Sequence, residues 1–246
     1  MKAVGVIPGR WQSKRFPGKI LTPICGRPLI HWVIENVSKA QSLDEVLVAT
    51  DDVRIAESVA STGVKAIMTR ADHPSGTDRV AEAVEGIAAD IIVNIQGDEP
   101  LIEPDLIDKL VGVLAENDWE MSTAVSPIRD EKELENPGVV KVVRREDGTA
   151  LYFSRSIIPH VRDHDSIPDG TLHWRHLGIY GYRRDFLKRV VQSAPCLLEE
   201  AEKLEQLRAL YLGARIGIVE TKDKGIGVDT PEDVAFVEQL IRAMRP

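Results

Sequence analysis

KAVGVIPGRWQSKRFPGK, residues 2–19, joins a short apolar strand to a cationic loop, and this unit sets the pattern for the rest of the chain. The run 2–7 is rich in small and β-branched residues, and Pro8 ends it. The loop that follows holds Arg10, Lys14, Arg15 and Lys19 with no acid among them. Cations and exposed backbone N–H groups after a strand suit a phosphate, so the loop predicts a site for a small anionic ligand. A solvated basic loop is the alternative reading.

Similar strands alternate with amphipathic helical patterns along the first half of the chain. Strands are predicted at 2–7, 45–50, 64–68 and 91–95, and helices at 28–40, 52–62 and 77–88. This alternation indicates βαβ units. The predicted fold class is α/β, with a Rossmann-like, mainly parallel sheet flanked by helices.

The second half is less regular. Residues 121–182 hold the strand-like runs VVKVVR, ALYF and HLGIYGY around a polar stretch, and we interpret this segment as a small inserted subdomain. A single helix is predicted over 198–212, with Leu204, Leu207 and Tyr211 as core residues, followed by the strand ARIGIVE and a closing helix at 231–243. Without a Pro/Gly/Ser linker, residues 1–246 are expected to form one domain.

Composition excludes several classes of protein. A formal net charge of −8 argues against general nucleic-acid binding, which needs a basic face. Only Cys25 and Cys196 are present, without metal-ligand spacing, which is expected of a cytoplasmic protein without disulfides. No run approaches the roughly 20 apolar residues of a membrane span, and no signal peptide is recognised.

The cationic loop is not one of the common nucleotide motifs. GxxxxGK followed by Ser or Thr is absent, and so is GxGxxG. Arginine can grip phosphate oxygens in bidentate fashion, and Lys19 adds a point charge after the Pro17-Gly18 turn. The cluster suits a polyphosphate better than a single carboxylate.

Two carboxylates are candidate metal ligands. Asp98 follows a buried strand, with Gly97 allowing close backbone approach, although an Asp in a Gly-Asp turn is often structural. In GVDTPED, Thr230 suits the N-cap, Pro231 the first helical position and Asp233 a capping box. Capping therefore does not require Asp229, which is left to bind a cation or to orient a cationic side chain.

The motifs together resemble the 3-deoxy-manno-octulosonate cytidylyltransferases of the nucleotide-diphospho-sugar transferase superfamily. They occur in the same order along nearly the whole chain: IPGRWQSKRFPGK, VATDD, MTRADHPSGTDR, VNIQGDEP, ALYFSR, RHLGIYGY, KLEQLR and GVDTPED. The sequence departs from the family at two positions. Gly9 stands where alanine is usual, and Lys14 stands where serine or threonine is common.

The resemblance implies a set of site residues. CTP would be bound by Arg10, Ser13, Lys14, Arg15, Lys19, Arg70, Asp72, Ser75 and Gly76. Asp98 and Asp229 would hold Mg²⁺ and act in catalysis with Lys19 and Arg10. The acidic sugar would contact Gln96, Arg155, His176, Tyr180, Glu205 and Gln206.

For several of these residues a structural role is the alternative. Ser75 and Thr77 are candidate helix caps, with Asp78 in the first turn. Tyr180 can be a core residue with a satisfied hydroxyl, and His176 can bond backbone at a strand start. His73 is expected to be a solvated surface residue.

The resemblance implies transfer of CMP from CTP to the anomeric hydroxyl of 3-deoxy-manno-octulosonate (Kdo), with release of pyrophosphate, for lipopolysaccharide synthesis. The alternatives are CMP transfer to 8-amino-Kdo or sialic acid, and a non-catalytic nucleotide-sugar sensor. The resemblance also implies a homodimer, with 121–182 contributing to its interface, and the apolar Ile157, Ile158 and Trp174 in polar surroundings support this expectation.

Overall fold

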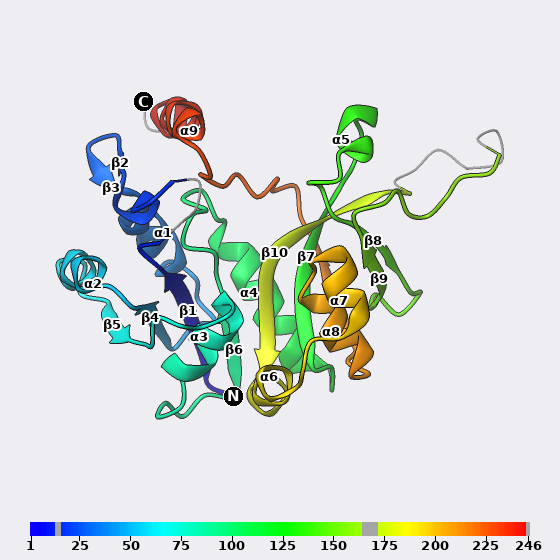
Figure 1. The fold of residues 1–246 in the computed structure, drawn as a ribbon, viewed down its shortest axis with the longest axis horizontal. Coiled ribbons are helices and arrows are strands. Elements are labelled where there is room, and N and C mark those ends of the chain that lie inside the picture. Colours follow the sequence, from blue (N-terminus) through cyan, green and yellow to red (C-terminus); the bar gives the residue numbers. More distant parts are fainter. Residues whose placement is uncertain (13–15, 164–171, 245–246) are drawn as a thin grey trace.

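The computed structural model describes residues 1–12, 16–163 and 172–244, and a mixed sheet organises them (Figure 1). Its order is β11-β7-β10-β6-β1-β4-β5, with β8 paired to β10 and β9 paired to β8. The strands of this sheet are β1 (Ala3–Gly9), β4 (Glu45–Thr50), β5 (Lys65–Met68), β6 (Ile91–Asn94), β7 (Met121–Pro127), β8 (Lys141–Arg144), β9 (Ala150–Ser154), β10 (Trp174–Arg183) and β11 (Ile216–Glu220). Strands β2 (Pro23–Ile24) and β3 (Arg27–Pro28) form a separate small hairpin.

The predicted fold class is confirmed. Strands β6, β1, β4 and β5 run parallel, as do β7 and β11, whereas β10 is antiparallel to both of its central neighbours. In β1, Val4, Val6 and Ile7 are fully buried, as expected for a parallel strand covered on both faces.

Helices cover both faces of the sheet (Figure 1). One apolar cluster contains residues of α1, α4 and α9, and the other contains residues of α3, α6 and α8. The helices are α1 (Leu29–Val37), α2 (Val53–Ala60), α3 (Gly76–Ala83), α4 (Pro104–Glu116), α5 (Glu131–Glu135), α6 (Arg184–Gln192), α7 (Leu197–Glu202), α8 (Gln206–Tyr211) and α9 (Pro231–Met244), with a 3-10 turn η1 at Lys19–Leu21. The segment after β11 crosses back to the N-terminal part of the sheet, where α9 packs beside β2.

The predicted helix over 198–212 is wrong in one respect, because the chain forms α7 and α8 instead. Lys203 adopts a left-handed conformation (φ 53°) that ends α7, and the Leu204 N–H donates to the Glu199 carbonyl (3.3 Å). Leu204 and Leu207 are buried as predicted, but Tyr211 is 70% exposed. The apolar spacing continues across the break, so periodicity alone could not reveal it.

The segment 121–182 enters the central sheet at both ends. β7 and β10 lie side by side in its middle, and only α5, β8, β9 and their connections leave that path. Strands β8 and β9 extend the same sheet through the pairing of β8 with β10. The place of this segment at a dimer interface stays a prediction.

No helix in the described residues combines the length and the apolar character that a membrane crossing requires.

Candidate active site

A cavity of about 950 Å³ opens where β1 and β6 end, and described residues of the cationic loop form part of its lining. The residues predicted for CTP that line it are Arg10, Lys19, Ser75 and Gly76. Both predicted metal ligands, Asp98 and Asp229, line it as well. Ser13, Lys14 and Arg15 were also predicted to bind CTP, but they lie outside the described residues.

Two glycines let the chain form this cavity. A Cβ on Gly97 would lie 2.8 Å from the Pro8 carbonyl oxygen, so only glycine allows the loop before Asp98 to approach the end of β1 this closely. Gly18 has φ 71°, and its N–H donates to the Trp11 carbonyl (2.9 Å). This turn starts η1 at Lys19 and brings the lysine into the cavity.

The Lys19 ammonium lies between the two predicted metal ligands. It donates hydrogen bonds to the Asp98 and Asp229 carboxylates, the latter at 2.9 Å. Burial opposes the charge of Lys19, but the two carboxylates outweigh that effect and raise its pKa. The ammonium is therefore charged at neutral pH, and both carboxylates face a single cation position.

The start of α9 matches the prediction from sequence. The backbone N–H groups of Asp229 and Thr230 donate to Oδ2 of Asp233 (2.9 and 2.8 Å), and Pro231 is the first helical residue. Asp233 thus provides the capping carboxylate. The Asp229 carboxylate contacts the Lys19 ammonium.

The loop 69–78 differs from the prediction in part. Ser75 caps α3: its hydroxyl accepts from the Asp78 N–H (3.2 Å) and donates to the Asp78 carboxylate (2.6 Å). Arg70 points its guanidinium to Glu82 and, like Asp72, does not line the cavity. The geometry therefore does not place Arg70 and Asp72 in the lining of this cavity, and their part in binding CTP stays a prediction.

The position of His73 differs from the expectation of a solvated surface residue. It is not a solvated residue, since its side chain is only 3% exposed, contacts Glu82 and borders the cavity. Arg79 on α3 borders the cavity too, held by Thr69 and Asp51. Neither residue was identified from sequence, because the pattern gave no sign that this side of the loop is buried.

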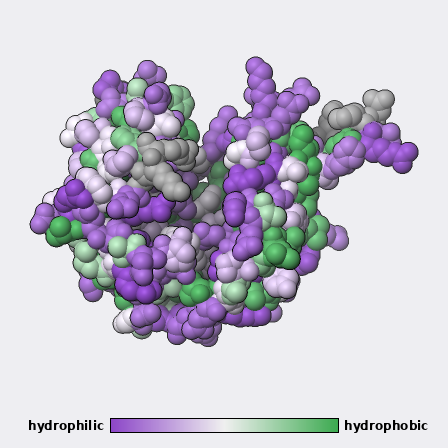
Figure 2. Space-filling model, viewed as in Figure 1, coloured by the Kyte–Doolittle hydropathy of each residue, from purple (hydrophilic) through white to green (hydrophobic). Residues whose placement is uncertain are grey.

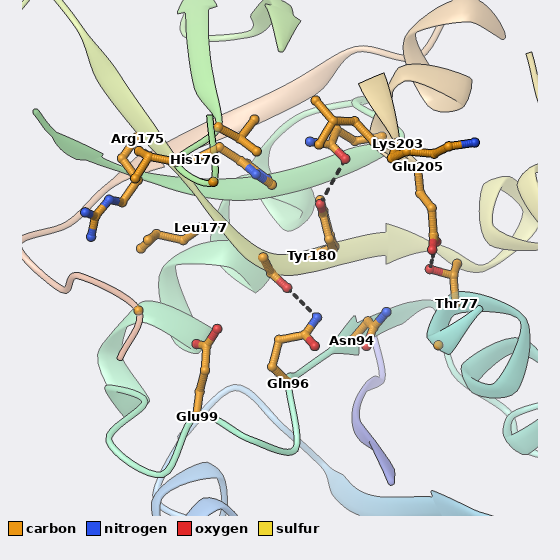
Figure 3. A pocket seen from close by; sticks show the side chains of 18 of the residues that line it. Thr77, Asn94, Gln96, Glu99, Arg175, His176, Leu177, Tyr180, Lys203 and Glu205 are labelled. Carbon is orange, nitrogen blue, oxygen red and sulfur yellow. Dashed lines mark hydrogen bonds between the residues drawn. The ribbon is translucent and has the colours of Figure 1, made fainter. Parts of the chain in front are cut away.

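A second cavity, of about 530 Å³, lies beside the first and contains most of the residues predicted for the sugar (Figure 3). Those that line it are Gln96, His176, Tyr180, Glu205 and Gln206. Gln96, Glu205, Pro8 and Gly76 line both cavities, so the two adjoin. Figure 2 shows the molecule hollowed between the part that carries α9 and the part that carries α5, with hydrophilic side chains along the rim.

Burial keeps the aromatic residues of this cavity neutral. It lowers the pKa of His176 to about 3, and His176 Nε2 lies 3.0 Å from the Thr123 hydroxyl. Burial also raises the pKa of Tyr180 well above its ordinary value, and the Tyr180 hydroxyl donates to Gln206 Oε1 (3.3 Å). Tyr180 is thus a protonated donor at neutral pH and is not isolated in the core.

Acidic side chains of the cavity are also perturbed. Burial raises the pKa of Glu99 to about 8, with smaller contributions from the charges of Asp98 and Asp223. Burial raises the pKa of Glu205 as well, although Thr77 donates a hydrogen bond to its carboxylate (2.9 Å). With a pKa of about 8, Glu99 is mostly protonated at neutral pH and offers a polar, uncharged contact.

Arg155 does not reach the cavity, contrary to the prediction. Its guanidinium donates to the carbonyls of Glu202 (2.7 Å) and Pro137 (3.0 Å), so it connects α7 to the loop before β8. Arg175, one residue before His176 on β10, lines the cavity instead. Among the described residues, Asn94, Glu99 and Lys203 also line this cavity, and none of them was predicted from the sequence.

A pair of carboxylates around one cation position, a large cavity beside a cationic loop and an adjoining polar cavity on an α/β sheet fit an enzyme that joins a nucleotide to a second, polar substrate. The model of the family described as "Cytidylyltransferase" matches residues 4–216. A 3-deoxy-manno-octulosonate cytidylyltransferase of Geobacter metallireducens is 49% identical over 98% of this chain and 99% of its own length. The one from Bdellovibrio bacteriovorus is 47% identical over 98% of each chain.

Two solved structures have a fold similar to that of this chain. A CMP:2-keto-3-deoxy-manno-octonic acid synthetase complexed with CTP is 42% identical, with a TM-score of 0.94 over 99% of this chain and 100% of its own. A 4-diphosphocytidyl-2C-methyl-D-erythritol synthase from Anaerococcus prevotii shares the fold, with a TM-score of 0.65 at 12% identity. The chain is a cytidylyltransferase, and it belongs to the family of the 3-deoxy-manno-octulosonate cytidylyltransferases.

Proposed function

We propose that this enzyme transfers CMP from CTP to the anomeric hydroxyl of Kdo, giving CMP-Kdo and pyrophosphate for lipopolysaccharide synthesis. The observation that carries the proposal is the pair of adjoining cavities that share Gln96 and Glu205, one cationic and one polar. The names of the relatives and the CTP in the similar solved structure support the choice of both substrates.

The residues of the larger cavity suit the triphosphate. Arg10 and Lys19 provide positive charge toward the phosphates and would neutralise the charge that develops on the departing pyrophosphate. The helix start of α3, with Gly76 at its first position, presents backbone N–H groups at the same cavity. Catalysis would consist mostly of positioning, since no covalent nucleophile is required.

Asp98 and Asp229 fit a magnesium ion. Among the described residues no group of three His, Cys, Asp or Glu side chains is suited to a metal, but two carboxylates that share one cation position provide the hard oxygen donors that Mg²⁺ takes together with substrate phosphates and water. When bound, Mg²⁺ supplies Lewis-acid stabilisation of phosphate charge. Lys19 would then be free to turn from the carboxylates toward the phosphates.

The polar cavity suits a polyhydroxylated acid. Gln96 donates to the Gly178 carbonyl (2.8 Å), which holds its amide at the border between the cavities. Arg175 and Lys203 are basic residues of the lining, as an acidic sugar requires, and the Arg175 guanidinium also forms an ion pair with the Glu133 carboxylate. The neutral His176 and the protonated Tyr180 offer hydrogen bonds without adding charge.

The deciding experiment is a pyrophosphate-release assay with CTP, UTP, ATP and GTP, each tested with Kdo, 8-amino-Kdo and sialic acid. We expect turnover with CTP and Kdo, and CMP-Kdo by product mass. Comparable turnover with a purine triphosphate would contradict the cytidylyl assignment, and preference for another acid would contradict the sugar. Binding of CMP-Kdo without any turnover would favour a sensor.

We also propose a homodimer working in the cytoplasm. Of the three residues that suggested an interface, Ile157 is 42% exposed, but Trp174 is buried under the Arg144 guanidinium. Further exposed apolar residues lie on β9, α7 and α8, namely Leu151, Leu197, Leu198 and Tyr211. Light scattering at micromolar concentration should give the mass of two chains; a monomer would contradict the proposal. Free Cys25 and Cys196 fit a reducing compartment.

A further inference from the structure

Two buried amide side chains in the smaller cavity each have a polar atom without a hydrogen-bond partner. They are Asn94, through Oδ1, and Gln206, through Nε2. Asn94 is 3% exposed and Gln206 is 4% exposed. A buried polar group that stays unpaired costs stability, so a protein normally supplies a partner for it. In a binding cavity, a group of the ligand can supply the missing partner.

The position of Asn94 makes this amide conspicuous. It is the last residue of β6, after Ile91, Ile92 and Val93, which are all fully buried apolar residues. The other residues of β6 are all aliphatic. The chain instead places an amide at the carboxyl end of a central parallel strand, where α/β proteins bind their ligands.

The neighbours of Asn94 place it within the sugar site. Across the antiparallel pair of β6 and β10 it lies directly opposite Tyr180, so both side chains share one face of the sheet. Figure 3 shows Asn94 beside Gln96 and Thr77, below Tyr180. Since Gln206 accepts the Tyr180 hydroxyl proton through Oε1, both amides belong to the surroundings of the same tyrosine.

The chemistry of the unpaired atoms selects the kind of ligand group. Asn94 Oδ1 is an acceptor and needs a donor, whereas Gln206 Nε2 is a donor and needs an acceptor. A carboxylate or a phosphate can only accept hydrogen bonds, so neither can pair with Asn94 Oδ1. A hydroxyl can both donate and accept, and so can serve both amides.

We propose that Asn94 is a specificity-determining residue of the sugar site, whose side-chain carbonyl accepts a hydrogen bond from one hydroxyl of the sugar chain. Gln206 donates to the same hydroxyl or to its neighbour. This inference rests on the proposed function and deepens it: the cavity recognises the sugar by its hydroxyls at this end as well as by its acid group.

The test combines Asn94→Leu, which keeps the approximate size of the side chain but removes the acceptor, with the monodeoxy analogues of Kdo. The control is Asn117→Leu, since the Asn117 amide donates to the Val113 carbonyl (2.9 Å) and lines neither cavity. For each protein, kcat/KM is measured for Kdo and every analogue at saturating CTP, and the Kd of CTP is measured by calorimetry.

We expect Asn94→Leu to lower kcat/KM for Kdo by about 10- to 100-fold, and to change the Kd of CTP by less than about threefold. With the wild type and with Asn117→Leu, one monodeoxy analogue should have a kcat/KM that is lower than that of Kdo by a similar factor. With Asn94→Leu, the same analogue should have nearly the same kcat/KM as Kdo. Such non-additivity assigns the hydroxyl to Asn94.

The assignment is overturned if every analogue keeps its full penalty in Asn94→Leu, or if no single hydroxyl matters to the wild type by more than about threefold. Should Asn94→Leu not fold, Asn94→Ala, which is smaller and also lacks the acceptor, enters the same comparison with the same expectation. Wild-type turnover of Kdo is measured first, so a failure of the proposed function is seen separately from a failure of the Asn94 assignment.

Discussion

Asp229→Asn is expected to separate catalysis from stability. The substitution keeps the shape of the side chain but removes one of the two carboxylates that face the Lys19 ammonium. The Asp229 side chain is 49% exposed, so its ion pair with Lys19 contributes at most about 1 kcal/mol to stability. For a domain of this size, that corresponds to a fall in Tm of roughly 2–4 °C.

The expected effect on turnover is much larger. Metal stabilisation of charge in phosphoryl transfer is worth several kcal/mol, and each ~1.4 kcal/mol is a factor of ten in rate. Losing one of two carboxylate ligands should therefore reduce kcat by about 100-fold or more at limiting Mg²⁺. Asp98→Asn should behave in the same way, because Asp98 contacts the same ammonium.

Asp233→Ala is the control at the same helix start. The Asp233 Oδ2 accepts from the N–H groups of Asp229 and Thr230, and alanine removes this acceptor, so the variant should lose about 1 kcal/mol of stability and keep most of its turnover. The assay is pyrophosphate release across a magnesium titration, with Tm measured on the same samples. Near-normal turnover of Asp229→Asn at limiting Mg²⁺, together with a lowered Tm, would refute the metal-ligand assignment.

Three further predictions follow from the geometry. Arg155→Ala should lower Tm and raise KM for the sugar while KM for CTP stays within about twofold, because Arg155 supports the cavity wall through backbone carbonyls; an unchanged sugar KM would contradict this. Lys19→Met should raise KM for CTP by about tenfold or more, as the phosphates lose a cation, and steady-state kinetics would show if it does not. Burial lowers the pKa of His176 to about 3. As the pH falls below the ordinary histidine pKa, the unfolded state therefore binds a proton that the folded state does not, and the free energy of unfolding decreases. Between pH 7 and 5 the wild type should lose on the order of 1–2 kcal/mol more of this free energy than His176→Gln in urea unfolding, and equal losses would contradict the prediction.

Much of the first half of the fold could be predicted from local sequence. The strands at 45–50 and 91–95 match β4 and β6 within one residue, because a parallel strand buried on both faces is a short, continuous apolar run. The start of α9 was also predictable, since a helix cap is made by residues within four positions of one another.

The errors fall where distant segments meet. The break between α7 and α8 depends on one left-handed residue, Lys203, inside a continuous apolar pattern. The antiparallel β10 between two parallel groups depends on pairing with β6 and β7, which no local pattern records.

The family, and many of the residues that line the two cavities, can be recognised from the sequence alone, because they lie in short motifs with a characteristic order. How these residues meet depends on the three-dimensional fold. Lys19 contacts carboxylates 79 and 210 positions away in the chain, and Arg155 turns from the cavity toward backbone carbonyls. From the sequence alone, Asn94 is one more residue of a buried strand. The pairing of β6 with β10 shows that it lies opposite Tyr180. Such contacts depend on strand order and on the packing of helices against the sheet, which are properties of the whole chain and not of any one segment.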